Sequence, residues 1–167
     1  MTSFSVTEIK NFMAKLLATD CFDSFLLEEA SISGAVNYHI DGHINKEFYT
    51  SEEWEDPAIR PHDFASWSQM RNICFSMIKG QRTPSAFKFV LHLMPEYVPG
   101  VLKGADPSLK PEQVKALVLT VKYDGNAVTI VTGTAFTSFV MDKTLDAQWD
   151  KTMRQFLTKK GIACLEK

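Results

Sequence analysis

The segment Lys115–Thr134, KALVLTVKYDGNAVTIVTGT, decides the fold of this chain. Two apolar, β-branched runs lie on either side of Asp124-Gly125, and Asp-Gly tolerates the positive φ angles of a tight hairpin turn. The segment therefore predicts a long β-hairpin. A two-residue loop at Asp124-Gly125 predicts three apolar cross-strand pairs: Val121 with Val128, Leu119 with Ile130, and Leu117 with Thr132. These pairs alternate with more polar ones, so we expect the first set to face the core.

Composition and periodicity predict one α+β domain over residues 1–167. The chain is 45% hydrophobic and 23% charged, as is usual for a folded globular protein. The predicted elements also divide into two helix-plus-three-strand units, residues 1–50 and 66–134, closed by a helix over 143–160. Because the net charge is -2, the chain lacks the basic footprint of a nucleic-acid-binding protein, and we expect no nucleic-acid partner.

The cysteines and the N-terminal residues bear on the cellular compartment of the protein. Three cysteines, an odd number without a Cys-x-x-Cys motif, favour free thiols in a reducing compartment. The first residues show no signal peptide, and no run is long and apolar enough for a membrane span. We therefore expect a cytoplasmic protein without a membrane association. The oligomeric state is left open.

Outward from the central hairpin, the hydrophobic pattern predicts a mainly antiparallel sheet of six to seven strands with three helices. Helices are expected at 7–18, 67–79 and 145–159, and single strands at 2–6, 25–33, 86–94 and 162–165. A second hairpin, Val36–Ile40 with Ile44–Tyr49, is predicted around Asp41-Gly42. A two-residue turn there would pair apolar with polar side chains, so a longer loop or a bulge is the alternative.

Two long connections supply the candidate partner-binding residues, which are Trp54, Tyr97, Val101 and Leu102. Trp54 lies among acidic residues in Thr50–Ser66, where it either anchors a partner or folds back over the sheet. The segment Pro95–Pro111 combines four prolines with an apolar cluster around Tyr97. Such a loop either packs on the domain as a lid or is presented to a partner.

One polar constellation is compatible with metal chemistry. His39 and His43 flank the turn of the expected second hairpin, and Glu47 adds a carboxylate. The simpler interpretation is an exposed hairpin tip with polar side chains. The chain contains no Walker A loop, no G-x-G-x-x-G, no G-x-S-x-G and no H-E-x-x-H motif, which excludes only the enzymes that use them.

Several stretches together resemble a small bacterial family of unknown function: FMAKLL near the start, FLLEEA in a strand, KYDG in the hairpin, and DAQWDKTMRQFL near the end. This resemblance implies no activity. The order of the two helix-plus-three-strand units also resembles one pair of units of the DNA sliding clamp fold.

These observations favour a non-catalytic, intracellular protein-interaction domain with no cofactor and no catalytic residues. One alternative is a small metal-dependent hydrolase built on His39 and His43. The other is a nucleic-acid-associated, clamp-like domain. The sequence leaves the partner and the biological process open.

Overall fold

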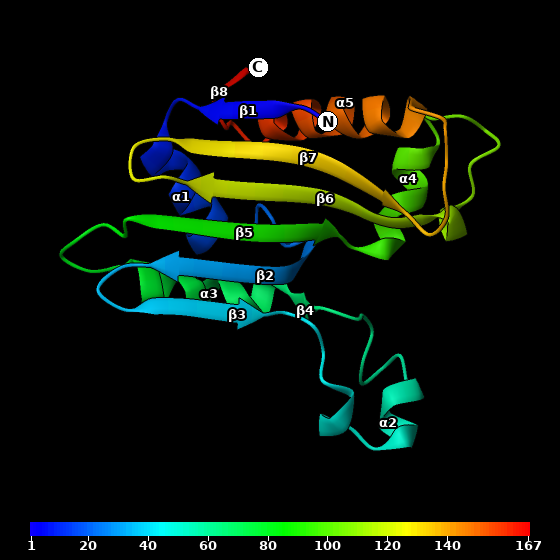
Figure 1. The fold of residues 1–167 in the computed structure, drawn as a ribbon, viewed down its shortest axis with the longest axis horizontal. Coiled ribbons are helices and arrows are strands. Elements are labelled where there is room, and N and C mark those ends of the chain that lie inside the picture. Colours follow the sequence, from blue (N-terminus) through cyan, green and yellow to red (C-terminus); the bar gives the residue numbers. More distant parts are fainter.

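A computed structural model describes all 167 residues and shows an α+β fold, as the sequence predicts, built on one antiparallel sheet of eight strands. The strand order is β3-β2-β5-β6-β7-β1-β8, and the short β4 lies beside β2 next to β3 (Figure 1). The strands are β1 (Ser3–Val6), β2 (Phe25–Ser33), β3 (Asn37–Asp41), β4 (Ala65–Ser66), β5 (Ala86–Leu93), β6 (Val114–Tyr123), β7 (Val128–Phe136) and β8 (Cys164–Glu166).

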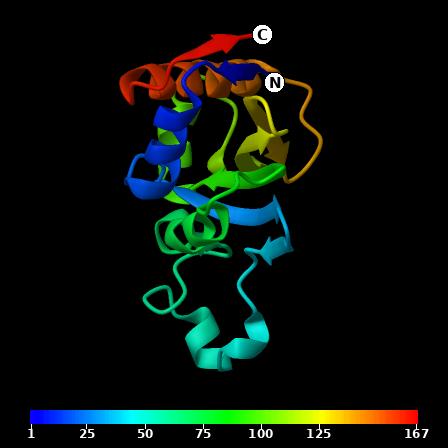
Figure 2. The same cartoon turned by 90° about the vertical axis from the view of Figure 1, so that its left-hand side faces the viewer.

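Three long helices cover one face of the sheet. They are α1 (Ile9–Ala18), α3 (Trp67–Ile78) and α5 (Thr144–Lys159), and two short helices, α2 (Ser51–Glu55) and α4 (Val98–Leu102), lie in the connections. Figures 1 and 2 show that no helix covers the opposite face of the sheet. None of these helices has both the length and the apolar character needed to cross a membrane.

The core is one cluster of 28 buried residues between the sheet and the long helices. The cluster includes Phe22 and Phe25, whose rings lie 6.0 Å apart, and Trp149 on α5, which lies 6.4 Å from Phe25. The partly buried Phe156 ring packs against them, 5.3 Å from Phe22 and 6.0 Å from Phe25. The Trp67 indole nitrogen donates to the Leu16 carbonyl, which ties α3 to α1. Burial of these large rings is the main source of stability.

The central hairpin forms, but its register differs from the predicted one by two residues. Val121 pairs with Ile130 and Leu119 with Thr132, because the two central turn residues are Gly125 and Asn126 rather than Asp124 and Gly125. Gly125 has a φ of 98°, which suits the first central position of a type II′ turn. A shift of two residues leaves every side chain on its expected face, since side chains alternate with period two.

The predicted second hairpin is wrong. Strand β3 instead pairs with β2, and His39 lies opposite Ser31. Gly42 follows β3 and crosses close to β2: its amide donates to the Glu28 carbonyl at 2.7 Å, where β2 has a register shift between Leu27 and Glu29. The chain then leaves the sheet, so residues 44–49 form no strand.

Candidate interaction arm

Residues 44–63, which we call the arm, project from the body of the molecule beyond the edge of the sheet (Figures 1 and 2). A narrow base holds both ends. His43 pairs with Phe64, the Ile44 amide donates to the Asp63 carbonyl at 3.0 Å, and the Ala65 amide donates to the Gly42 carbonyl at 2.8 Å. The arm therefore leaves and rejoins the sheet at one point, where backbone hydrogen bonds hold its two ends together.

Helix α2 gives the arm a local structure of its own. The Glu53 amide donates to the Thr50 hydroxyl at 3.1 Å, and the Thr50 amide donates to the Glu53 carboxylate at 2.9 Å. This reciprocal pair is a capping box, which satisfies two amides at the helix start. The Thr50 amide, followed by its hydroxyl, holds the pKa of the Glu53 carboxyl below its usual range. The carboxylate that accepts from the Thr50 amide is therefore ionised at neutral pH.

Trp54 is part of the scaffold of the arm. The Arg60 guanidinium lies 3.7 Å from the centre of the Trp54 ring, and its Nε donates to the Trp54 carbonyl at 2.9 Å. Arg60 also pairs with Asp63 at 2.8 Å, while the Tyr49 ring lies 6.2 Å from the Trp54 ring. This cation–π stack leaves the indole half-buried. Trp54 thus holds the two sides of the arm together.

The large exposed side chains of the arm are Phe48 and Ile59, which sequence analysis did not single out. Phe48 is 82% exposed and Ile59 is 47% exposed. Phe48 precedes Tyr49 in an otherwise polar segment, and that aromatic pair was the one signal available in the sequence. An exposed aromatic side chain on a projecting segment is typical of an anchor for a partner.

The surface of the arm is strongly acidic. Six carboxylates and two cations lie within residues 44–63, which gives a charge of -4 with neutral histidine, whereas the whole chain has -2. The rest of the chain therefore carries +2. The carboxylates are Glu47, Glu52, Glu53, Glu55, Asp56 and Asp63.

The predicted metal residues are distributed over three segments. His39 lies on β3, His43 at the base of the arm, and Glu47 in a 3-10 turn, Lys46–Phe48. His43 Nδ1 lies 2.6 Å from the Asp41 carboxylate, and the pKa of Asp41 is lowered mainly by the His43 backbone amide. No three His, Cys, Asp or Glu side chains gather into a set that could hold a metal ion. The hydrolase alternative stays a prediction, which elemental analysis of purified protein tests.

The segment Pro95–Pro111 packs on the body of the molecule. Helix α4 buries Val101 and Leu102 in the core cluster, beside α5, while Tyr97 remains half-exposed. His62 of the arm contacts Glu96 at 3.0 Å, so this segment also supports the base of the arm. Of the candidates in this connection, only Tyr97 is accessible to a partner in the folded protein.

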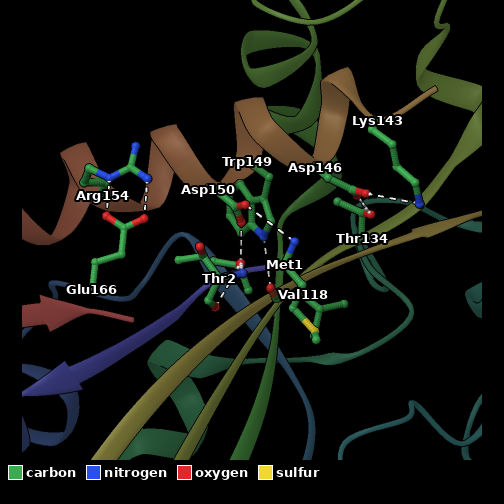
Figure 3. A network of polar contacts seen from close by, with 11 residues as sticks. Met1, Thr2, Val118, Thr134, Lys143, Asp146, Trp149, Asp150, Arg154 and Glu166 are labelled. Carbon is green, nitrogen blue, oxygen red and sulfur yellow. Dashed lines mark hydrogen bonds and ion pairs between the residues drawn. The ribbon is translucent and has the colours of Figure 1, made fainter.

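A polar seam joins α5 to β7 on the helical side of the sheet (Figure 3). Asp146 and Asp150, one helical turn apart, accept hydrogen bonds from the Thr134 and Thr132 hydroxyls, and the Trp149 indole donates to the Val118 carbonyl at 3.0 Å. Every buried side-chain nitrogen and oxygen atom in the chain has a hydrogen-bond partner. The seam therefore fixes α5 on the sheet.

Comparisons with known proteins place the chain in a family. Neither the curated proteins nor the solved structures include a match. A family model described as "Family of unknown function (DUF5721)" matches residues 15–164. That match spans the end of α1, the entire arm, the central hairpin and α5, and the chain therefore belongs to the DUF5721 family of unknown function.

Proposed function

We propose that this chain is a non-catalytic protein-interaction domain and that the arm is its binding element. The observation that carries the proposal is the exposure of Phe48 and Ile59 on a segment that projects from the body. The three free thiols fit a cytoplasmic setting.

The build of the arm supports this role. Its exposed apolar side chains add nothing to the core, because the core cluster contains no residue between Ile32 and Trp67. Yet the capping box and the Arg60–Trp54 stack hold the arm in one shape. A preordered anchor loses little conformational entropy on binding, which favours affinity.

The charge of the arm defines the kind of partner. A surface with a charge of -4 favours a partner whose apolar pocket is framed by lysine or arginine. Phe48 would enter the pocket, and the carboxylates of α2 would meet the cationic rim. Attraction between the acidic arm and a cationic partner accelerates their association, whereas the arm repels other acidic surfaces.

Site-specific photocrosslinking tests the proposal. The photoreactive residue p-benzoylphenylalanine replaces Phe48 in one variant and Phe139, which is 89% exposed outside the arm, in a matched control. Both variants are irradiated in an extract of the cells that make the protein. A discrete adduct from position 48 and none from position 139 supports the arm as the binding element. No adduct from position 48, or the same adducts from both positions, contradicts it.

A further inference from the structure

A groove at the opposite end of β3 from the arm has the properties expected of the partner of the arm. It has a volume of about 380 Å³ and runs between the start of β3 and the end of α3. Its apolar lining includes Val36, Tyr38, Met77, Ile78 and Pro84. Val36 is 61% exposed and Tyr38 is 40% exposed, so the groove presents large uncovered apolar side chains.

The groove also carries cations without carboxylate partners. Lys79 and Arg82 line it, and neither belongs to any ion pair of the chain. Lys79 lies 5.8 Å from the Phe75 ring, its one cation–π contact. Apolar walls with a cationic rim complement an acidic segment that carries an exposed phenylalanine.

Strand β3 provides a way to bring arm and groove together. It is an edge strand of the sheet, with a free line of backbone amides and carbonyls. Its sequence, NYHID, contains neither the proline nor the lysine that often protects such edges. An exposed strand of this kind is a template for pairing with another strand.

We propose that the partner of the arm is a second copy of this chain, paired antiparallel through β3 about a two-fold axis. The residues that line the groove include Val36 and Tyr38, at the N-terminal end of β3. The arm follows the C-terminal end of β3 (Figure 1). Antiparallel pairing places the N-terminal end of one β3 beside the C-terminal end of the other. Each arm then reaches the groove of the other copy, and the two contacts are identical, as two-fold symmetry requires.

This inference rests on the arm being a binding element and names its partner. Reciprocal contacts join an arm with a charge of -4 to Lys79 and Arg82 twice in each dimer. Phe48 and Ile59 of each copy then face Tyr38, Met77 and Ile78 of the other. Both exposed apolar regions are covered by a single symmetric arrangement.

Charge reversal with complementation tests the dimer. The groove-reversed variant is Lys79→Glu/Arg82→Glu, and the arm-reversed variant is Glu52→Lys/Glu55→Lys, which leaves the capping residue Glu53 intact. The matched control, Lys10→Glu/Lys103→Glu, changes the same charge at exposed positions away from β3. Sedimentation velocity gives the dimer Kd for each protein, and circular dichroism checks that each is folded.

We expect the native chain and the control to dimerise, and each reversed variant to dimerise at least about tenfold more weakly. A one-to-one mixture of the two reversed variants restores the dimer, because both of its arm-to-groove contacts then join opposite charges. A native chain that stays monomeric through about 100 µM overturns the inference. Reversed variants that dimerise normally, or a mixture that fails to associate, also overturn it.

The photocrosslinking experiment separates this inference from the proposed function. A position-48 adduct with a second copy of the chain supports both. An adduct with a different protein, together with a monomeric native chain, overturns the dimer and leaves the arm as a binding element. The absence of any adduct at position 48 removes the proposed function itself.

Discussion

Gly42 is the residue that directs the chain from the sheet into the arm. A Cβ atom at this position would lie 1.8 Å from the Leu27 carbonyl oxygen, a backbone atom that cannot yield as a flexible side chain does. We expect Gly42→Ala to lower the free energy of unfolding by more than about 2 kcal/mol. Gly80→Ala is the control, because nothing lies within 4 Å of the added Cβ. Equal urea-denaturation midpoints for the two variants would contradict this account.

The same residue explains one limit of the sequence. Asp41-Gly42 and Asp124-Gly125 carry the same local hairpin signal. In the first pair the glycine serves a close approach to the bulge of β2, and in the second it opens a type II′ turn. The Asp-Gly dipeptide alone does not tell these two roles apart, because the role of Gly42 depends on its contact with β2, more than ten residues away in the sequence.

At the scale of elements, the capping box of α2 gives the arm a pH dependence. The folded pKa of Glu53 is lowered, so the contribution of the cap is present above the usual carboxyl pKa and is lost as the pH falls through the lowered value. We expect Thr50→Ala to raise the pKa of Glu53, because the Thr50 hydroxyl contributes to the lowering of this pKa and the substitution removes it. Carbon-detected NMR titration of the Glu53 carboxyl measures the change. An unaltered titration in the variant would show that the cap is not formed in solution.

Helix α4 lies in the segment for which the sequence predicted either a lid that packs on the domain or a surface presented to a partner. Replacement of Pro99–Ser108 by a short Gly/Ser linker removes Val101 and Leu102 from the core. Because each large-to-small core change costs about 2–5 kcal/mol, we expect a total loss of more than about 4 kcal/mol in urea denaturation. Tyr97→Ala, at an exposed position, should cost less than about 1 kcal/mol. A shortened protein of nearly native stability would show that α4 is only peripheral.

Local periodicity predicted most elements well. The strand over 25–33 has the predicted bounds, and α3, α5 and β5 differ from prediction by a residue at one end. Alternation also placed Leu117, Leu119 and Val121 on the buried face of β6. Short helices such as α4 escape this reasoning, because five residues complete little more than one turn and show no periodic face.

At the scale of the whole molecule, the order of the strands in the sheet could not be predicted from the sequence. The α+β class follows from the hairpins and separated helices, and it is confirmed. The insertion of β5 between β2 and β6 depends on which strands meet after long connections, and no local pattern carries that choice. For the same reason the acidic segment around Trp54 could be predicted to be exposed, but its projection as an arm could not.

Deletion of the arm tests whether the molecule is a self-sufficient body with a separate binding element. Residues 45–62 are replaced by a short Gly/Ser turn between Ile44 and Asp63, whose backbones are already joined by a hydrogen bond. No residue of the core cluster is removed, and the surface interactions that the deletion removes, such as His62 with Glu96, contribute little to stability. We therefore expect cooperative unfolding with a free energy within about 1 kcal/mol of the native value. Measurement at two protein concentrations separates this intramolecular effect from dimer dissociation, since association adds stability that rises with concentration. Loss of cooperative unfolding at both concentrations would show that the arm is part of the folding unit. A deletion variant that stays stable but no longer binds the partner crosslinked from position 48 would assign binding to the arm alone.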